Sequence, residues 1–484
     1  MEVGLKIGSR WQRHLLLALV TGFALRLFFI RYFRFEAGDT RIYEELARNW
    51  LDHSVYGLFI DGRLVPVDIR APGYPAFLAI IYAALGRSRI AVMFVQSLVD
   101  LVSCALIGLL ATRIAPESGR CRAAIAAVWL AALCPFTANY TAVPLTEVLA
   151  LFFTVIALLS LINGCMGRER LTVFLGRHAY ILNAWFLGGI LVGLGTLVRP
   201  EGPLILASVA LVLVVRWRRR ADWRKLLSVG LLTGAGLMLP LAPWAARNAY
   251  SMHRWQFLAP RYAEMPGEFV PRGFLHWTQT WLVKFQDVYL VPWKLEEEPI
   301  PIETIPYSAF DSDEERSRVA QLLTRYNEDL TVSPELDHEF EDLARERSRR
   351  HPIRTYLMVP ISRIATLWMT PRLELLPFSG ALWPPLARWK EDPIDFSVAV
   401  GFGLLNFVYL TMAIAGGWRS RGNRGLIFLL CFILVRTLFL TGVETPEPRY
   451  VLVCFPVILA FAALLWARPP ERGSSSIANL VQEE

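Results

Sequence analysis

The sequence predicts an all-α integral membrane protein with about 10–11 transmembrane helices, interfacial helices in the first outer loop and a large mixed outer segment. Three observations predict this class: the overall hydrophobicity, its division into long blocks, and the distribution of charge between the blocks. Of the 484 residues, 54% are hydrophobic, and the mean hydropathy is +0.39. Soluble domains average about 45–50% apolar residues, so the composition favours a membrane protein.

The hydrophobic blocks are long enough to cross a membrane. A transmembrane helix needs about 20 mainly apolar residues, and the shorter blocks reach that length with their flanks. A helix on the surface of a soluble protein would interrupt such blocks with a polar face. We expect about ten spans, and the clearest blocks are 14–33, 90–112, 123–143, 148–162, 181–198, 226–246, 396–415, 426–440 and 451–466.

The charge between the blocks predicts the orientation. Arginine is concentrated at both ends and in the short loops 113–122, 168–177, 216–225 and 419–424, whereas the long segment 247–351 is rich in Asp and Glu. The positive-inside rule places the short basic loops and both termini in the cytoplasm, and the acidic segment outside. The formal net charge is +8, but no basic surface stands clear of the blocks, which argues against a nucleic-acid partner.

The first outer loop, 34–75, predicts an amphipathic helix over 39–51. Its apolar residues recur at helical spacing: Ile42, Leu46, Ala47 and Trp50. The segment is too short and too charged to cross the membrane, so we expect it to lie at the interface. Pro72 and Pro75 then predict a rigid turn, and a second short apolar segment follows at 77–85.

Two parts of the outer segment give further predictions. The charged stretch 311–350 is typical of helix, with a helix start at Pro334 capped by Ser333. The stretch 355–370 is apolar but contains Pro360 and Arg363. Reading it as a span would turn the basic loop 417–424 outward, so we favour an interfacial or re-entrant helix, with a span as the alternative.

These elements divide the chain into four parts. We expect an N-terminal transmembrane module at 1–246, which includes the first outer loop, and an outer segment with interfacial helices at 247–393. The C-terminal transmembrane helices follow at 394–467, and a polar cytoplasmic tail at 468–484.

Charged side chains at membrane depth are costly and usually have a role. Five clusters of them are expected at the outer ends of spans: Glu36 and Asp39; Arg70; Glu147; Arg199 and Glu201; and Glu444, Glu447, Arg449 and Tyr450. Together they would suit an anionic group held by arginines beside a carboxylate base.

Each cluster also has a purely structural interpretation. Asp39 and Glu147 would be suitable helix caps, and Arg70 could extend to the interface with its stem in the apolar layer. The turn 199–202 could be only a tight connection, and Glu447 with Arg449 only a local ion pair. The shared position of the five clusters favours the functional interpretation.

The order of motifs carries a family resemblance. The stretches are Gly38-Asp39-Thr40-Arg41-Ile42-Tyr43-Glu44-Glu45-Leu46-Ala47, Arg70-Ala71-Pro72-Gly73-Tyr74-Pro75-Ala76-Phe77-Leu78, Thr146-Glu147, Leu197-Val198-Arg199-Pro200-Glu201-Gly202, Pro243-Trp244-Ala245-Ala246-Arg247-Asn248 and Glu447-Pro448-Arg449-Tyr450. In this order they resemble the GT-C glycosyltransferases, specifically the bacterial protein-O-mannosyltransferase-like family that uses polyprenyl-phosphate-linked sugars. Many relatives carry a second acid after the loop aspartate, where this chain has Thr40.

The resemblance implies a multi-pass enzyme of the bacterial inner membrane whose active site faces the periplasm. The donor would be a polyprenyl-phosphate-linked sugar, and the acceptor a lipid, glycan or protein. No cofactor is certain from the motifs, and a divalent cation is possible. The implied catalytic residues are Asp39 and Glu147, with Asp39 as base in an inverting transfer. The implied residues for the donor phosphate or substrate are Arg70, Tyr74, Arg199, Glu201, Arg247, Glu447, Arg449 and Tyr450.

A transporter or flippase for lipid-linked sugars is the alternative function, because it too needs a charged cavity at membrane depth. The sequence shows no repeated halves and no pair of broken helices in matching positions, and its charges gather at one membrane face. A scaffolding membrane protein is a third reading, which leaves the outer charges unexplained.

Overall fold

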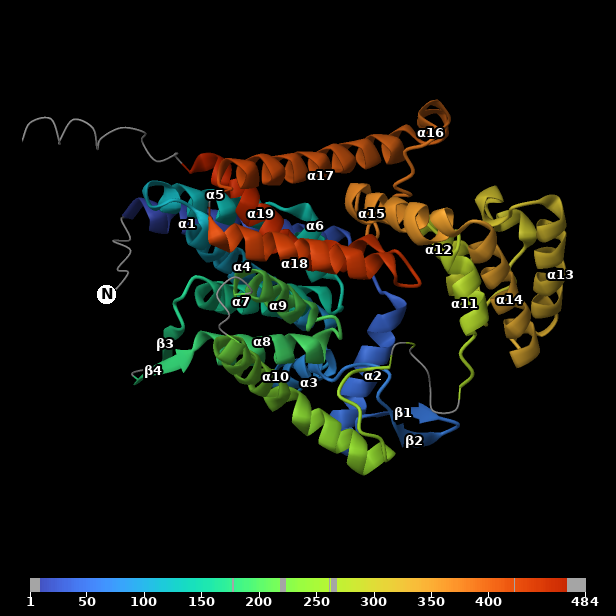
Figure 1. Cartoon of the computed structure of the whole chain (residues 1–484), viewed down its shortest axis with the longest axis horizontal. Helices are drawn as coiled ribbons and strands as arrows, with labels where there is room; N and C mark the ends of the chain where they lie inside the picture. Colours follow the sequence, from blue (N-terminus) through green and yellow to red (C-terminus); the bar gives the residue numbers. More distant parts are fainter. Residues whose placement is uncertain are drawn as a thin grey trace, which may run out of the picture.

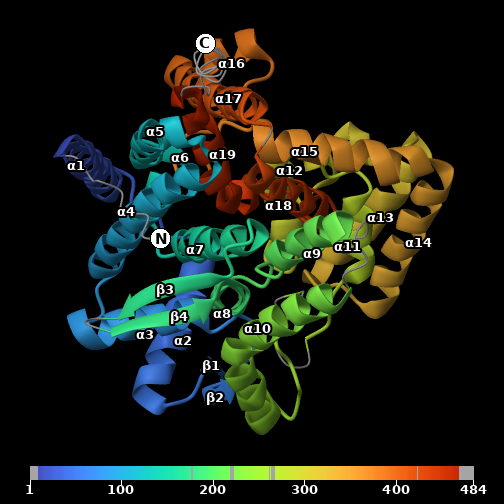
Figure 2. The same ribbon diagram turned by 60° about the vertical axis from the view of Figure 1, so that its left-hand side comes forward.

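The computed structural model describes residues 9–175, 178–217, 223–260, 262, 268–421 and 423–467. Within these ranges the chain is helical apart from two short hairpins, which confirms the all-α class. Figures 1 and 2 show long helices side by side, with α13 and α14 far from α1. The expected limits of the four parts of the chain stay predictions, and the expected tail 468–484 lies outside the described residues.

Six segments of the described chain are long and apolar enough to cross a membrane. They are α1 (Ser9–Tyr32), α4 (Arg89–Ile114), α7 (Glu147–Cys165), α10 (Trp223–Met252), α17 (Pro393–Arg419) and the stretch Pro448–Trp466, which comprises η7 (Pro448–Cys454), α19 (Phe455–Ala463) and η8 (Leu464–Trp466).

A seventh candidate span is broken. It begins with η1 (Glu117–Gly119) and α5 (Arg120–Ala132), then bends by 50° into α6 (Pro135–Ala138) and η2 (Asn139–Ala142). Pro135 stands at the break, where it lacks the N–H that would continue the helix. Three shorter apolar helices correspond to the remaining expected spans: α8 (Ala184–Val198), α9 (Leu204–Trp217) and α18 (Arg424–Thr441). That these three also span stays a prediction.

A buried ion pair joins the first helices. Arg26 of α1 donates to Asp100 of α4 from Nε at 2.8 Å, and to the carbonyl oxygens of Gly22 and Ala132 at 2.7 and 2.9 Å. Neither charged side chain reaches solvent. This pair was not predicted, although two opposite charges inside apolar blocks are a signal for it.

The first outer loop folds as a small unit at one end of the bundle, here called the α2 end (Figure 1). It contains α2 (Gly38–His53), β1 (Gly57–Ile60), β2 (Arg63–Pro66) and α3 (Gly73–Leu85). The two helices were expected, and the antiparallel hairpin was not. Its turn residues Asp61 and Gly62 have φ of 49° and 75°, and Asp-Gly is a favoured pair for such a turn.

The chain after α10 forms a helical unit with a hydrophobic core of its own at the same end. Its elements are α11 (Arg272–Gln279), α12 (Phe285–Leu290), η3 (Pro292–Lys294), η4 (Ile302–Thr304), η5 (Tyr307–Ala309), α13 (Asp313–Asp329) and α14 (Pro334–Arg350). Phe274, Trp277 and Phe340 are buried together. The predicted start of α14 is confirmed, because the Ser333 hydroxyl accepts from the N–H of Leu336 at 3.2 Å.

The stretch 355–370 forms a π turn, η6 (Arg354–Met358), and α15 (Val359–Met369). It is not among the candidate spans of the described chain, but neither are α8, α9 and α18, so the choice between an interfacial helix and a span stays a prediction. Arg363 donates to the carbonyl oxygens of Leu282, Gln279, Thr441 and Val443, so α15 joins the helical unit to the end of α18. A short helix, α16 (Pro385–Glu391), then leads into α17.

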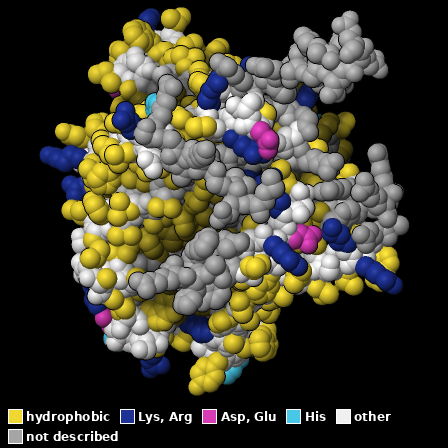
Figure 3. Space-filling view, turned by 90° about the vertical axis from the view of Figure 1, so that its left-hand side faces the viewer, with side chains coloured by type: hydrophobic (Ala, Val, Ile, Leu, Met, Phe, Trp, Pro, Cys, Tyr) yellow, Lys and Arg dark blue, Asp and Glu magenta, His cyan; other side chains and the backbone are white. Residues whose placement is uncertain are grey.

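The opposite end of the bundle carries the hairpin of β3 (Arg170–Leu175) and β4 (His178–Asn183). Figure 3 looks onto this end, where Lys and Arg side chains are spread over the coloured surface with few Asp or Glu between them. This end carries the arginine-rich loop 168–177, whereas the acidic segment 247–351 belongs to the α2 end.

Candidate active site

A cavity of about 220 Å³ lies at the α2 end, where several distant parts of the chain meet. Its lining includes members of all five clusters expected from the sequence, while Glu36, Glu444 and Glu447 do not line it. The lining residues are Asp39, Tyr43, Ile69, Arg70, Ala71, Leu145, Thr146, Glu147, Val198, Arg199, Pro200, Glu201, Ala259, Pro260, Arg449 and Tyr450. The start of α2, the loop before α3, the start of α7, the α8–α9 turn and the start of η7 thus converge on one volume.

Asp39 stands in the first turn of α2 and faces two arginines. It accepts from Arg70 Nη2 at 2.7 Å, and Arg449 Nη2 lies 3.8 Å from its other oxygen. The interpretation of Asp39 as a helix cap is wrong, because Ala37 occupies the N-cap position and no side chain caps the helix. Its partner lies in another loop, so the carboxylate serves a tertiary contact.

Burial alone would raise the pKa of the Asp39 carboxyl, but the charges of Arg70 and Arg449 outweigh it, so the pKa lies below its ordinary value. For Arg70, burial lowers the pKa of the guanidinium, but the charge of Asp39 raises it by more, so the pKa lies above its ordinary value. Both groups are therefore ionised at neutral pH.

Glu147 begins α7 and is 2% exposed. Its Oε1 lies 3.0 Å from Arg199 Nη1 and 3.8 Å from Arg449 Nη1. Glu147 is not the N-cap of α7, because Thr146 occupies that position and no side chain caps the helix. Its place in the first turn still suits a carboxylate.

The turn between α8 and α9 brings Arg199 and Glu201 together, with Arg199 Nε 3.5 Å from Glu201 Oε2. Burial lowers the pKa of Arg199, and the neighbouring charges of Glu201 and Glu147 raise it by more. Glu201 shows the reverse: burial raises its pKa and Arg199 lowers it, to a net decrease. The turn is therefore a tight connection and also part of the charged site.

Glu447 lies behind the cavity and holds two of its lining residues. Arg449 Nε forms an ion pair with Glu447, and the hydroxyl of Tyr450 donates to the same carboxylate. The guanidinium groups of Arg199 and Arg449 lie over the Tyr450 ring at 5.2 and 5.6 Å from its centroid. The local ion pair foreseen for Glu447 and Arg449 exists, and it also aims Arg449 at Glu147.

Carboxylates and arginines therefore alternate through the site. Each arginine contacts a carboxylate within 4 Å, and Arg449 reaches three of them. Because these ion pairs depend on the attraction between carboxylate and guanidinium groups, an incoming anion can compete with the carboxylates for the guanidinium donors.

Besides Glu447, two predicted residues lie outside the cavity. Tyr74 is buried, donates its hydroxyl to Gln96 at 2.6 Å and contacts the ring of Tyr43 edge-on at 5.1 Å. Arg247 binds the carbonyl oxygens of Val67, at 2.9 Å, and of Tyr56. Arg247 thereby holds the first outer loop in place. The loop is linked to the cavity through Tyr56, whose hydroxyl donates to the carbonyl oxygen of Arg70 at 2.9 Å.

Some residues of the site were not predicted. Tyr43 lines the cavity, and its spacing of four residues from Asp39 on α2 is a signal that could have found it. Burial, and next the charge of Asp39, raise the pKa of Tyr43 to about 12, so it remains a protonated donor. Arg436 of α18 is buried and donates to the carbonyl oxygen of Tyr450 at 2.9 Å. Ala259 and Pro260 follow α10, in a segment without a recognisable motif.

The described residues contain no group of three or more His, Cys, Asp or Glu side chains placed to hold a metal ion. The carboxylates of the cavity lie against arginines instead of facing one another.

No protein-family model and no curated protein matches the chain. Solved structures of an archaeal oligosaccharyltransferase from Archaeoglobus fulgidus are similar in fold. The structure of AglB with an inhibitory peptide and a dolichol-phosphate has a TM-score of 0.48 and 12% identity, and the match covers 98% of this chain and 54% of that one. The enzyme in complex with Zn and sulfate gives 0.47 and 14%, covering 94% and 48%. The chain thus spans about half the length of these proteins, and at this level of likeness its function has to be inferred from its own site.

Proposed function

We propose that this chain is a membrane glycosyltransferase that moves a sugar from a polyprenyl-phosphate-linked donor to an acceptor. The single observation that carries the proposal is the cavity at the α2 end, where Asp39, Glu147 and three arginines from distant segments meet. A scaffolding role would give no reason to collect these charges at the end of apolar helices.

The place of the cavity fits a lipid-linked donor. An isoprenoid chain stays in the bilayer, because each buried CH₂ contributes about 0.8 kcal/mol. Its phosphate must then rest at the end of the spans, where Arg70, Arg199 and Arg449 lie. Guanidinium groups bind phosphate through forked donors, which a lysine cannot reproduce.

In the proposed reaction a hydroxyl of the acceptor attacks the anomeric carbon of the sugar. The new C–O bond forms as the bond to the lipid phosphate breaks, with inversion at that carbon. The proton of the hydroxyl goes to Asp39, and the polyprenyl phosphate leaves with its added negative charge beside the arginines. General base catalysis of this kind contributes about 10²–10⁴-fold.

Because Asp39 is paired with arginines, the donor phosphate would also change the strength of Asp39 as a base. A carboxylate held between Arg70 and Arg449 is a weak base, because its pKa lies below the ordinary value. A donor phosphate that takes up donors of the same arginines brings negative charge next to Asp39 and raises its pKa. The base is then strengthened only when the donor is in place.

The proposed location is the bacterial inner membrane, with the α2 end facing the periplasm or exterior. The arginine-rich opposite end supports this orientation under the positive-inside rule. The acceptor would be a lipid, glycan or protein that arrives from the outer side.

The test is purified full-length protein in lipid nanodiscs, supplied with synthetic polyprenyl-phosphate-linked sugars and scored for release of polyprenyl phosphate. Release that depends on Asp39 supports the proposal. Movement of the intact lipid-linked sugar between the leaflets of vesicles, without release, would replace it with the flippase function.

The phosphate site can be tested separately through Arg70→Lys, Arg199→Lys and Arg449→Lys. Each substitution keeps the positive charge and removes the fork, so donor binding should weaken in at least one of them. Normal donor affinity in all three variants would place the phosphate elsewhere. Arg388→Lys, on the exposed helix α16, is the control.

A further inference from the structure

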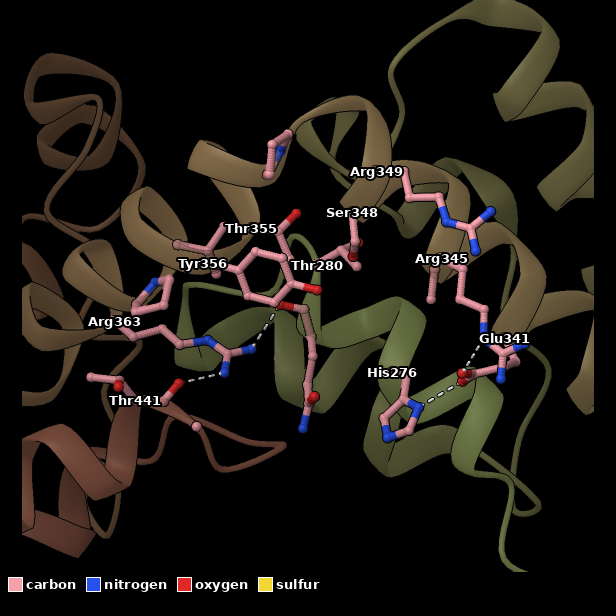
Figure 4. A pocket seen from close by; sticks show the side chains of 16 residues that line it. His276, Thr280, Glu341, Arg345, Ser348, Arg349, Thr355, Tyr356, Arg363 and Thr441 are labelled. Carbon is pink, nitrogen blue, oxygen red and sulfur yellow. Dashed lines mark hydrogen bonds and ion pairs between the residues drawn. The ribbon is translucent and has the colours of Figure 1, made fainter.

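A second and larger cavity, of about 620 Å³, lies where α11, α14, η6 and α15 meet the end of α18 (Figure 4). It shares no lining residue with the cavity of Asp39. Its volume falls in the range of small-molecule sites, which is about 300–1,000 Å³. None of its lining residues takes part in the proposed transfer reaction.

The lining carries more positive than negative charge. Glu341 is its one carboxylate, and its oxygens are occupied by His276 Nδ1 at 2.6 Å and Arg345 Nε at 2.9 Å. Arg363 is bonded only to backbone carbonyl oxygens within the described chain. Arg349 has no hydrogen bond or ion pair among the described residues, so its guanidinium is free for an anion.

Two buried polar atoms of the lining also lack partners. Gln279 Nε2 and Thr355 Oγ1 have no hydrogen bond within the described structure and are closed off from solvent. Buried polar atoms of native proteins are nearly always satisfied, and a ligand with oxygen atoms in this cavity would offer partners to both. An apolar ligand would leave both atoms unpaired.

The arrangement of these groups describes the shape of the ligand. In Figure 4, Arg363 lies at one end of the cavity and Arg345 and Arg349 at the other, with Ser348, Thr355 and Tyr356 between them. Because the donors of Arg363 are already used, the anionic group belongs at the Arg349 end and hydroxyl groups in the middle.

The η6 turn, which contributes Thr355 and Tyr356 to the lining, exposes large hydrophobic side chains. Tyr356, Leu357 and Met358 of η6 are 72%, 56% and 58% exposed, which is unusual for large hydrophobic side chains in water and ordinary against acyl chains.

We propose that this second cavity binds a phosphate-linked polyol, with the phosphate at Arg345 and Arg349 and hydroxyl groups at Gln279 and Thr355. The same chemistry occurs in the headgroup of an anionic phospholipid and in a soluble polyol phosphate. The exposed apolar side chains of η6 favour the phospholipid. This site is independent of the transfer reaction, so its failure would leave the proposed function intact.

The experiment is native mass spectrometry of the full-length protein in mixed micelles of phosphatidylglycerol and phosphatidylcholine. Wild type should retain phosphatidylglycerol in preference. Arg349→Gln should lower its retention about tenfold, the loss expected for one charge-assisted hydrogen bond. Arg318→Gln removes the same charge from an exposed ion pair on α13, outside the cavity, and should retain the lipid as wild type does.

Thr355→Val separates binding from folding. Its hydroxyl has no partner within the described residues, so the variant should melt no earlier than wild type and still lose phosphatidylglycerol. Calorimetry with glycerol 1-phosphate identifies the source: binding that Arg349→Gln weakens, without a preference for phosphatidylglycerol, supports the site and assigns it to a soluble ligand. If neither probe responds to Arg349→Gln or Thr355→Val, the proposal is overturned.

Discussion

The sequence allows two interpretations of Asp39, a helix cap and a catalytic base, and the structure excludes the cap. Its position at the start of a helix favours an N-cap, but its oxygens face Arg70 and Arg449. A cap would be served equally well by asparagine, whereas a proton acceptor would not. The two roles therefore predict different outcomes for one substitution.

We expect Asp39→Asn to lower sugar transfer by at least about 10²-fold, the lower end for a lost general base. Because the helix has no side-chain cap to lose, the variant should stay folded and bind donor. The measurement is release of polyprenyl phosphate together with a thermal melt. Glu36→Gln is the matched control, since Glu36 forms exposed ion pairs with Arg41 and Arg89 in the same loop. An Asn variant as active as this control removes Asp39 from the mechanism.

The depressed pKa of Asp39 gives a prediction about pH. The active form is the ionised one, so activity is lost as pH falls through the pKa of this group. In the free protein that pKa lies below its ordinary value of 3.8, and the phosphate of bound donor should raise it. The acid limb of kcat, which reports the donor complex, should then lie at higher pH than that of kcat/KM, which reports the free protein. Coincident limbs would contradict the proposed effect of the donor.

At the scale of elements, the sequence predicts the helices but not the bend and the hairpin that lie between them. Length and periodicity gave α1, α4, α7 and α2, and a Ser-Pro pair gave the start of α14, because these signals are local in sequence. The hydrophobicity of 123–143 predicts one straight block, although Pro135 inside it is a signal for a break. The β1–β2 hairpin was missed despite its Asp61-Gly62 turn.

Part of the site could be predicted for the same reason. Charged residues stand out in apolar sequence, so Asp39, Arg70, Glu147, Arg199 and Arg449 could be named from their positions alone. Which arginine pairs with which acid depends on how helices pack, and the roles of Arg436 and Arg247 follow only from tertiary contacts.

One joint can be tested directly. Gly73 begins α3 against the end of α8, where an added Cβ would meet the carbonyl oxygen of Leu197 at 2.6 Å. Gly73→Ala must separate the two segments that hold Arg70 and Arg199. We expect a loss of about 1–3 kcal/mol in stability, as for an overpacked core, with reduced transfer. Denaturant unfolding and the release assay measure both.

Gly38→Ala is the control for this joint, because a Cβ at Gly38 would meet nothing within 4 Å. Equal behaviour of the two alanine variants would contradict a requirement for close contact at Gly73.

At the scale of the whole molecule, the two ends of the bundle differ in charge and content. The α2 end carries the site and the acidic helical unit, and the opposite end carries the β3–β4 hairpin and the arginine-rich surface (Figures 1 and 3). The proposed reaction requires the α2 end to face outward, since donor and acceptor would arrive there.

Cysteine labelling in intact cells tests this orientation. Ser317→Cys, at an exposed position of α13, should react with a membrane-impermeant maleimide from outside. The native Cys121, exposed at the start of α5, should react only after permeabilisation and serves as the internal control. The reverse pattern would place the site in the cytoplasm and contradict the proposed access of the acceptor.

The charged network draws its members from almost the full length of the chain, and this has a consequence for biogenesis. Translation produces Asp39 and Glu147 early, Arg199 later, and Arg449 only with the last helical stretch. Before Arg449 is made, Asp39 already has Arg70 as a partner and Glu147 has Arg199. Arg449 arrives together with Glu447, so the segment Pro448–Trp466 adds no net charge to the site, but it brings the arginine that links the two earlier pairs. Insertion of this segment, and not of the helices before it, is then the step that joins the two pairs into one site.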